Sequence, residues 1–487
     1  MRNGTKAMLA AAGILALTIT PVAADASKPS TTRDLWTEFT YRGAPARSDE
    51  ARHYDLCDSR SPSFQNNQAL MRAMGLQRFP GPAHNRLARG MVADTIEDGI
   101  IVAMEKGQRR RIRAEFGIHE RYLKSFAEAY QAGNGEIETR DRFLQSSFSH
   151  PKPIYVSHIY TYRERNSCSL YSVYPESRMC AGRKPAAQPG FIGGIDALAS
   201  AFDSHVKPAL TSGRFTHVMF MAMGWHNDQQ VSLCRYNAIS EATQRASKAM
   251  KRPFKPYIVG VTWPSAWFSA SPVDFIDTAG HLGSVFNKAD DADEVGYLVG
   301  NLIANRLIPL ANPHQIPSVA LGHSFGTRII NRSVFSRDLL RGGPVGSGPK
   351  LTIALQPAHS IFRFLPRGGV EGHPFVNLDG LDTVLVATSS VHDTANPLAI
   401  WSRYVGGRGG LATARNETNR PWVDLVRADK PLEPHEAVAH TLRQMDASPD
   451  KPIIVDASSF VFQHNDVMSD DMGRFVAGLI DKYAPAR

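Results

Sequence analysis

The hydrophobic positions beyond residue 150 form short apolar runs that alternate with longer segments of helical periodicity. Runs of this length are typical of buried strands, and the segments between them are long enough for helices. The strands are expected at residues 217–223, 257–262, 318–321, 351–355, 383–388 and 452–456. The helices are expected at residues 237–250, 292–308, 325–340, 436–445 and 467–483. This alternation implies right-handed crossovers and predicts an α/β fold, a mostly parallel sheet with helices on both faces.

The part of the chain before residue 150 has a different pattern. Residues 27–149 look helical and irregular, and their longest periodic stretch is 85–132. Residues 154–162 and 170–174 are rich in β-branched and aromatic side chains, as the strands of a hairpin would be. We therefore predict an N-terminal accessory region at 27–149 and a main domain at 150–487.

The first 26 residues have the organisation of a secretory signal peptide. Arg2 and Lys6 precede an apolar run at 8–17, and residues 24–26 have the small-x-small form of a cleavage site. The alternative, a retained anchor helix, is disfavoured because the run is too short to span a bilayer. A secreted or periplasmic protein is expected.

Composition excludes several classes of protein. Hydrophobic residues make up 43% and charged residues 21% of the 487 residues, which is ordinary for a globular protein and argues against wholesale disorder. A net charge of +9 over so long a chain does not indicate a nucleic-acid partner. One basic cluster is compatible with peripheral contact with an anionic membrane, although charge runs on helices are usually solvated faces. It consists of Lys106, Arg109, Arg110, Arg111 and Arg113.

Four cysteines are present, at positions 57, 168, 180 and 234. An even number in an exported chain permits disulfides, and Cys168 and Cys180 are the favoured pair because they close a short loop. The pairing of Cys57 and Cys234 stays open. The spacing fits no zinc motif, and no metal is expected.

One strand ends in a motif that carries chemistry. The run at 318–321 leads into Gly322-His323-Ser324-Phe325-Gly326 and then into a helix-length segment. This is the G-x-S-x-G pattern of a nucleophile elbow, a sharp turn between strand and helix that exposes the serine hydroxyl. The flanking glycines remove the side chains that would clash there.

On these residues, positions 150–487 resemble the α/β-hydrolase superfamily, specifically its secreted esterase and lipase-like members. The resemblance implies a serine nucleophile, then an acid, then a histidine in chain order, and it implies no cofactor. It leaves residues 27–149 without an explanation.

The acid is expected in the loop after the strand at 383–388. Asp393 lies in that loop, whereas Asp379 and Asp382 precede the strand and would lie at the wrong end of the sheet. The alternative is that Asp393 caps the turn before Pro397.

The histidine is expected after the last strand. His464 is the first histidine beyond 452–456 and lies just before the final helix. His392, beside the candidate acid, and His359, after the strand at 351–355, are the competing positions.

An oxyanion hole needs two N–H donors. The N–H of Phe325, directly after the nucleophile, is one candidate. The other is the N–H of Trp225, in Met223-Gly224-Trp225 after the strand at 217–223. This loop resembles the family's His-Gly-x segment with Met223 in place of His, which removes the usual anchor. Gly224 and Trp225 also fit a plain tight turn beside a core aromatic residue.

The substrate is expected to be a small-molecule or lipid ester. Trp263 and Trp267 follow the strand at 257–262, and Trp263-Pro264-Ser265 resembles a family segment. These aromatic residues are candidates for an apolar substrate-binding wall, or equally for core packing. Cleavage of amides or thioesters on the same residues, and a non-catalytic binding protein with the same fold, remain alternatives.

Overall fold

The computed structural model describes the parts of the chain that form a sheet and the helices around it. The described residues are 99–105, 155–161, 194–225, 227, 229–263, 265, 288–289, 291–293, 295–337, 346–365, 383–393, 403–427, 432–445 and 451–486. All of them belong to one compact unit of the chain. The predicted signal peptide, Cys57, Cys168, Cys180, Trp267 and the basic cluster at 106–113 lie outside these residues, and the side chain of Cys234 is not described.

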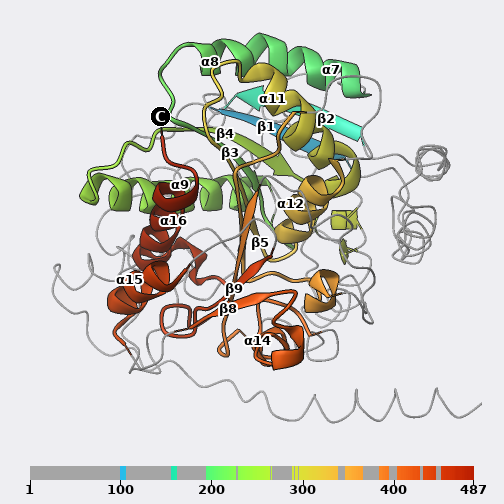
Figure 1. The fold of residues 1–487 in the computed structure, drawn as a ribbon. Helices are drawn as coiled ribbons and strands as arrows, with labels where there is room; N and C mark the ends of the chain where they lie inside the picture. Colours follow the sequence, from blue (N-terminus) through green and yellow to red (C-terminus); the bar gives the residue numbers. More distant parts are fainter. Residues whose placement is uncertain are drawn as a thin grey trace, which may run out of the picture. The chain divides into compact units, whose positions relative to one another are not determined.

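A nine-stranded sheet runs through the centre of the described residues (Figure 1). Its strands are β1 (Gly99–Glu105), β2 (Tyr155–Thr161), β3 (His217–Ala222), β4 (Pro256–Thr262), β5 (Ser318–His323), β6 (Leu351–Leu355), β7 (Val384–Ser389), β8 (Asp424–Val426) and β9 (Ile453–Asp456). Their order is β2-β1-β4-β3-β5-β6-β7-β9-β8. Every neighbouring pair is parallel except β1 and β2, which are antiparallel. The prediction of an α/β fold with a mostly parallel sheet is confirmed.

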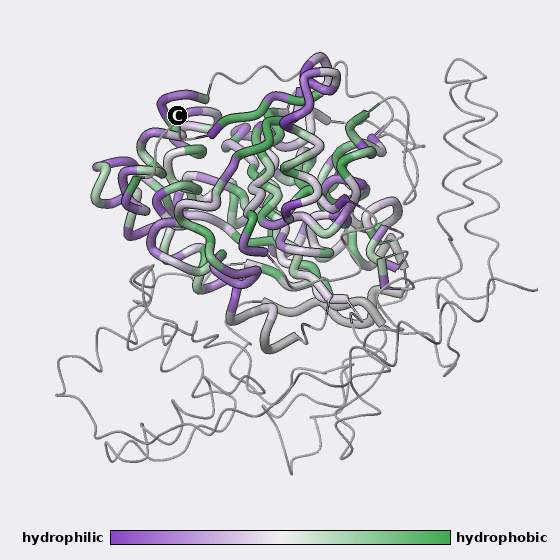
Figure 2. The backbone as a smooth tube through the Cα atoms, turned by 90° about the horizontal axis from the view of Figure 1, so that it is seen from below, coloured by the Kyte–Doolittle hydropathy of each residue, from purple (hydrophilic) through white to green (hydrophobic). Residues whose placement is uncertain are grey.

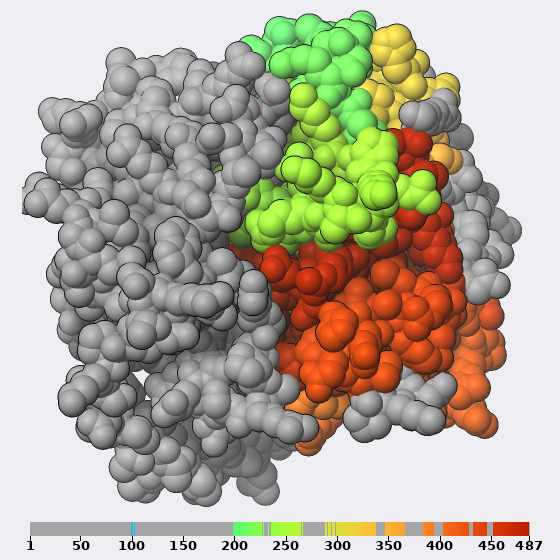
Figure 3. Space-filling model, turned by 90° about the vertical axis from the view of Figure 1, so that its left-hand side faces the viewer, coloured from blue at the N-terminus to red at the C-terminus, as the bar shows by residue number. Residues whose placement is uncertain are grey.

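Helices cover both faces of the sheet (Figure 1). One face carries α9 (Gln229–Ala249), α15 (Pro434–Gln444), η9 (Asp466–Met468) and α16 (Asp470–Tyr483). The other carries α7 (Gly194–Ala201), η3 (Phe202–Val206), α8 (Lys207–Thr211), η4 (Gly296–Gly300), η5 (Ile303–Leu307), α11 (Ile308–Ala311) and α12 (Gly326–Phe335). Shorter elements are η7 (Ile361–Phe364), α14 (Arg408–Ala414) and η8 (Glu417–Asn419). Figure 3 shows α9, in light green, directly beside the red C-terminal elements that share its face.

The apolar side chains of the strands alternate between two cores. In β3, Met219 and Met221 face the core under α9 and α16, whereas Val218 and Phe220 face the core under α12. Because both faces are covered, the strands are largely apolar, and β3 and β4 are buried at every position. Figure 2 shows hydrophobic segments in the middle of the described part and hydrophilic ones at its margin.

The structure corrects the reading of the N-terminal region in one respect. Residues 99–105, inside the stretch expected to be helical, form strand β1, which pairs with β4. A boundary near residue 150 therefore does not separate this segment from the main sheet. β2 pairs with β1, and the expected hairpin partner of β2 at 170–174 lies outside the described residues.

Two further elements differ from the expected ones. The helix expected at 292–308 includes the π-helical segments η4 and η5. The three-residue strand β8 pairs with β9 and was not predicted. Among the described residues, no helix is both long and apolar enough to cross a membrane.

Candidate active site

Ser324 occupies the turn between β5 and α12 in a strained conformation. Its φ angle is 55°, in the left-handed region that non-glycine residues rarely adopt. Its N–H donates to the carbonyl of Leu355 at 3.1 Å, and its own carbonyl accepts from the N–H groups of Thr327 at 3.1 Å and Ala358 at 3.3 Å. Such strain costs about 1 to 3 kcal/mol and persists only where surrounding contacts hold it in place. The side chain that this turn presents remains partly exposed.

The glycine after Phe325 makes this turn compatible with the sheet. A Cβ on Gly326 would lie 2.0 Å from the carbonyl oxygen of Ala222, at the end of β3. No side chain fits there, so only glycine lets α12 begin directly against the neighbouring strand. The N-terminal end of α12 is thereby set beside Ser324.

Asp393 and His464 form a hydrogen-bonded pair. His464 Nδ1 lies 2.8 Å from Asp393 Oδ2, although the residues are 71 positions apart. The His464 side chain is 19% exposed, and the Asp393 side chain is 8% exposed. An ionised carboxylate only accepts hydrogen bonds, so Nδ1 carries the proton and Nε2 is left as the basic nitrogen. This is the orientation that a general base requires.

His323 joins this pair to the elbow. Its Nε2 lies 2.9 Å from the carbonyl oxygen of His464, and the two rings are 4.7 Å apart. Burial, together with the nearby charges of His464 and Arg235, holds the pKa of His323 well below its usual range. The ring is therefore neutral and donates from Nε2 to that carbonyl. Because His323 directly precedes Ser324, the loop that carries His464 is tied to the elbow. Sequence analysis missed this role, although His323 stands inside the motif.

The loop after β3 lies directly against Ser324. A Cβ on Gly224 would come within 2.6 Å of Ser324 Cβ and 2.9 Å of the backbone nitrogen of Phe325. The backbone of the expected oxyanion loop can approach so closely only because position 224 lacks a side chain. Phe325 is buried, whereas Trp225 is partly buried and packs against the α12 core.

Trp263 supports this loop from behind. It is 2% exposed, and its indole N–H donates to the carbonyl of Met223 at 2.8 Å. The side chain is therefore a buried anchor of the loop, which agrees with core packing, one of the two alternatives expected for it. Trp225 belongs to the loop that lies against Ser324, directly after Gly224.

The competing histidines occupy other environments. His359 is fully buried, and its Nε2 is hydrogen-bonded to Asn331 Nδ2 at 2.9 Å. His392 lies beside Phe462, with ring centroids 5.8 Å apart. The competing acids Asp379 and Asp382 lie outside the described residues. Among the described residues, the pair of His464 and Asp393 is the one tied to the elbow.

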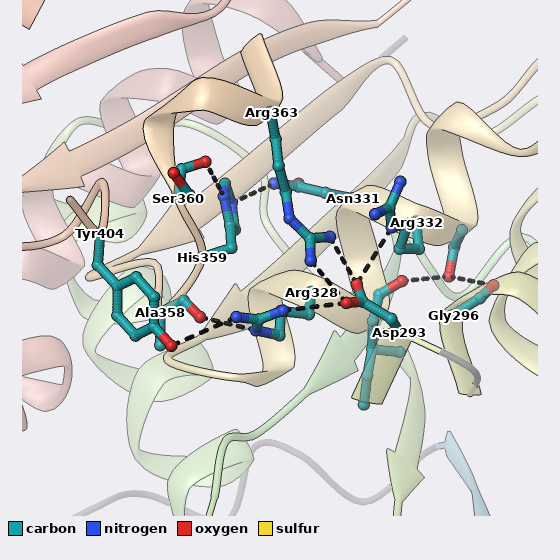
Figure 4. Close-up of polar contacts among 12 residues, drawn as sticks. Asp293, Gly296, Arg328, Asn331, Arg332, Ala358, His359, Ser360, Arg363 and Tyr404 are labelled. Atoms are coloured by element: carbon teal, nitrogen blue, oxygen red, sulfur yellow. Dashed lines mark hydrogen bonds and ion pairs between the residues drawn. The ribbon is translucent and has the colours of Figure 1, made fainter. Parts of the chain in front are cut away.

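A buried ionic cluster includes two arginines of α12, the helix that follows Ser324 (Figure 4). Asp293 accepts from Arg328 at 3.0 Å, from Arg332 at 3.1 Å and from both terminal nitrogens of Arg363 at 2.7 Å. Burial by itself raises the pKa of Asp293, but the charges of the three arginines outweigh it and hold the pKa far below its ordinary range. Arg328 Nε also donates to the carbonyl of Ala358 at 2.7 Å. Since the N–H of Ala358 binds the Ser324 carbonyl, the cluster supports the strained turn.

Comparisons of the chain with protein-family models, with curated proteins and with solved structures found no match. Within the described residues, no group of three or more His, Cys, Asp or Glu side chains is arranged to hold a metal ion.

Buried histidines make the stability of the protein depend on pH. Burial lowers the pKa of His217, His323 and His359, against an ordinary value of 6.5. The unfolded chain therefore binds protons that the folded chain does not, and stability falls as the pH drops below about 6.5. Each such histidine contributes a slope of up to about 1.4 kcal/mol per pH unit.

We expect the free energy of unfolding, measured by urea titration, to decrease steadily from pH 7 toward pH 5. Replacing His217, which lies at the start of β3 away from Ser324, by Gln should reduce that slope. A free energy of unfolding that is constant over this range would contradict the assignment of these histidines as neutral in the folded state.

Proposed function

We propose that this protein is a serine hydrolase of the α/β-hydrolase class that cleaves carboxylic esters. The observation that carries the proposal is the convergence of three loops. Ser324 stands at a positive φ after β5, and the paired His464 and Asp393 are tied to that turn through His323. The strand order β4-β3-β5-β6-β7-β9 supports it, since parallel strands bring these loops to one edge of the sheet.

The proposed reaction proceeds through an acyl-enzyme. Ser324 Oγ attacks the ester carbonyl carbon while His464 Nε2 takes the hydroxyl proton, and Asp393 stabilises the imidazolium that forms. The N–H groups of Phe325 and Trp225 stabilise the developing oxyanion. The tetrahedral intermediate collapses, the ester C–O bond breaks, and His464 gives its proton to the leaving alcohol. Water, activated by the same imidazole, then attacks the acyl-enzyme and releases the carboxylic acid.

A fluorophosphonate probe tests the proposal. An activated serine becomes covalently labelled, whereas the serine of a non-catalytic binding protein need not react. We expect one label per chain, located on Ser324 by peptide mapping and absent from the Ser324→Ala variant. No labelling of folded protein would favour the binding-protein alternative, and labelling at another residue would show that Ser324 is not the nucleophile. Assays with matched ester, amide and thioester substrates distinguish the alternative hydrolytic activities.

The proposed substrate is a neutral ester with an apolar acyl group, either a small molecule or a lipid. Trp225 is large, apolar and partly buried, and it directly follows Gly224, which lies against Ser324. Burying one methylene contributes about 0.8 kcal/mol, which corresponds to about a fourfold gain in kcat/KM. We expect kcat/KM on p-nitrophenyl esters to rise from acetate toward medium chains, and Trp225→Ala to flatten the trend. A profile that peaks at acetate would contradict the apolar site without affecting the proposed triad.

The location in the cell also remains a proposal. Residues 1–26 are proposed to direct export to the periplasm or the medium, with a disulfide between Cys168 and Cys180. Intact mass and non-reducing peptide mapping of exported protein test both points. A chain that retains residue 1 or carries four free thiols would overturn them.

A further inference from the structure

The oxyanion loop lacks the histidine that the family resemblance would place at position 223, yet its carbonyls are held. The indole N–H of Trp263 donates to the carbonyl of Met223. The side chain of Asn227 binds the next two carbonyls: its Nδ2 donates to the carbonyl of Gly224 at 2.9 Å and to that of Trp225 at 3.0 Å. Asn227 is 5% exposed, so these bonds are shielded from water. Three consecutive carbonyls are therefore fixed by two side chains.

Fixing a carbonyl also fixes the N–H of the next residue. In a trans peptide the C=O and N–H groups point in opposite directions. When Asn227 holds the carbonyl of Gly224, the N–H of Trp225 must point away from Asn227. Gly224 itself lies against Ser324 Cβ and the backbone nitrogen of Phe325. The peptide group between Gly224 and Trp225 is thus anchored by Asn227 at a point where the backbone lies against Ser324.

Asn227 is in turn held by the neighbouring strand's loop. Ser265 Oγ, after β4, donates to the backbone carbonyl of Asn227 at 2.8 Å, and both residues are buried. Because Trp263 also follows β4, the loop after β4 supports the loop after β3 at two points. The loop after β3 is thus supported by Trp263 and Ser265, two residues of the loop after β4, in a chain that lacks the family's histidine at position 223.

On the proposed hydrolase function, we propose that Asn227 is a positioning residue of the oxyanion hole, which orients the Trp225 N–H toward the carbonyl oxygen of the substrate. Its carboxamide donates to the backbone carbonyls of Gly224 and Trp225. It acts through the Gly224 to Trp225 peptide group. Asn227 replaces, in this role, the histidine absent at position 223.

Asn227→Asp tests the proposal, because a carboxylate has nearly the same shape but cannot donate to the two carbonyls. We expect kcat on a p-nitrophenyl ester to fall about 10²-fold with little change in KM, since a donor misplaced by about 1 Å loses transition-state stabilisation. Affinity for an alkyl boronic acid, which forms a tetrahedral adduct on the serine, should fall in parallel. A purely structural role would not produce this parallel loss.

Asn312→Asp is the matched control. Asn312 is buried, and its Nδ2 also donates to a backbone carbonyl, that of Ile316, but it follows α11 away from the proposed site. This variant should lose thermal stability without losing kcat or boronate affinity. Ser265→Ala, which removes only the hydrogen bond to the Asn227 carbonyl, should lower kcat about tenfold, and it provides the test if Asn227→Asp does not fold.

The outcomes separate this inference from the proposed function. If Ser324→Ala is inactive but Asn227→Asp and Ser265→Ala both retain wild-type kcat and boronate affinity, the positioning role is wrong and the hydrolase proposal stands. A Ser324→Ala protein with full activity would overturn the hydrolase proposal itself. A loss of kcat in Asn312→Asp equal to that in Asn227→Asp would show that the effect is general destabilisation, and would overturn the positioning role.

Discussion

Ser324→Ala and His464→Ala should each lower kcat for ester hydrolysis by roughly 10⁴ to 10⁶-fold, because each removes one half of a nucleophile and base that act as a unit. Combining the two substitutions should add almost nothing, since either one already disables the unit. Asp393→Asn should cost somewhat less, because it leaves the base present but removes the acceptor that orients Nδ1 at 2.8 Å. Steady-state kinetics on a p-nitrophenyl ester, with purified protein, measure all four variants.

Matched substitutions outside the proposed site keep these measurements interpretable. Ser204→Ala and His314→Ala change the same residue types at exposed positions and should retain wild-type rates. Far-ultraviolet circular dichroism and the melting temperature of each variant show whether the fold is intact. If the Ser324→Ala and His464→Ala losses multiply in the double variant, the two side chains act independently and the proposed triad is wrong.

Asp293→Asn should give the largest loss of stability, about 3 to 5 kcal/mol, because it removes the negative charge that compensates buried cations. Asp293 accepts hydrogen bonds from three arginines, two of them fully buried and the third only 2% exposed. An asparagine fits the same volume, so the loss reflects charge and hydrogen bonding and does not arise from a cavity. The urea midpoint of unfolding measures it.

A surface ion pair provides the comparison for Asp293. Arg415 and Asp456 are also 2.8 Å apart, but the arginine is 46% exposed. Asp456→Asn should therefore cost only about 0.2 to 1 kcal/mol. Equal losses for Asp293→Asn and Asp456→Asn would show that the buried cluster does not contribute as the geometry indicates. Because Arg328 connects the cluster to the turn through Ala358, Asp293→Asn should also lower the temperature at which esterase activity is lost.

The strands that sequence analysis predicted best are those with strong apolar runs. Residues 351–355 coincide with β6, and 217–223 and 257–262 each match a strand to within one residue. A parallel sheet that is buried on both faces requires such runs, so its strands can be predicted from the sequence without tertiary information. β1 and β8 lack that signal: β1 lies in a stretch of helical periodicity, and β8 is three residues long. These two segments become strands through their backbone pairing in the sheet, β1 with β4 and β8 with β9.

Chain order was enough to nominate Ser324, Asp393 and His464, because the elbow motif and the strand pattern each restrict the chemistry to a few loops. Chain order placed His464 ahead of His392 and His359, because His464 is the first histidine after the last strand, but it left the other two as competitors. The structure distinguishes them through contacts, since His464 bonds Asp393 and is held by His323, whereas His359 is enclosed with Asn331. Partners 71 and 141 positions away decide this, and no local pattern encodes such distances.

The sequence by itself determined the α/β class, the turn that carries Ser324 and the loops from which its partners would come. The sterics of the turn and the alternation of apolar segments depend only on residues that are close in sequence, so these features can be predicted without knowledge of the fold. Only the tertiary structure decided that Asn227, Trp263 and His323 support the site and that Asp293 lies among three arginines. Those roles depend on which polar groups become buried beside one another, and burial is a property of the packed chain.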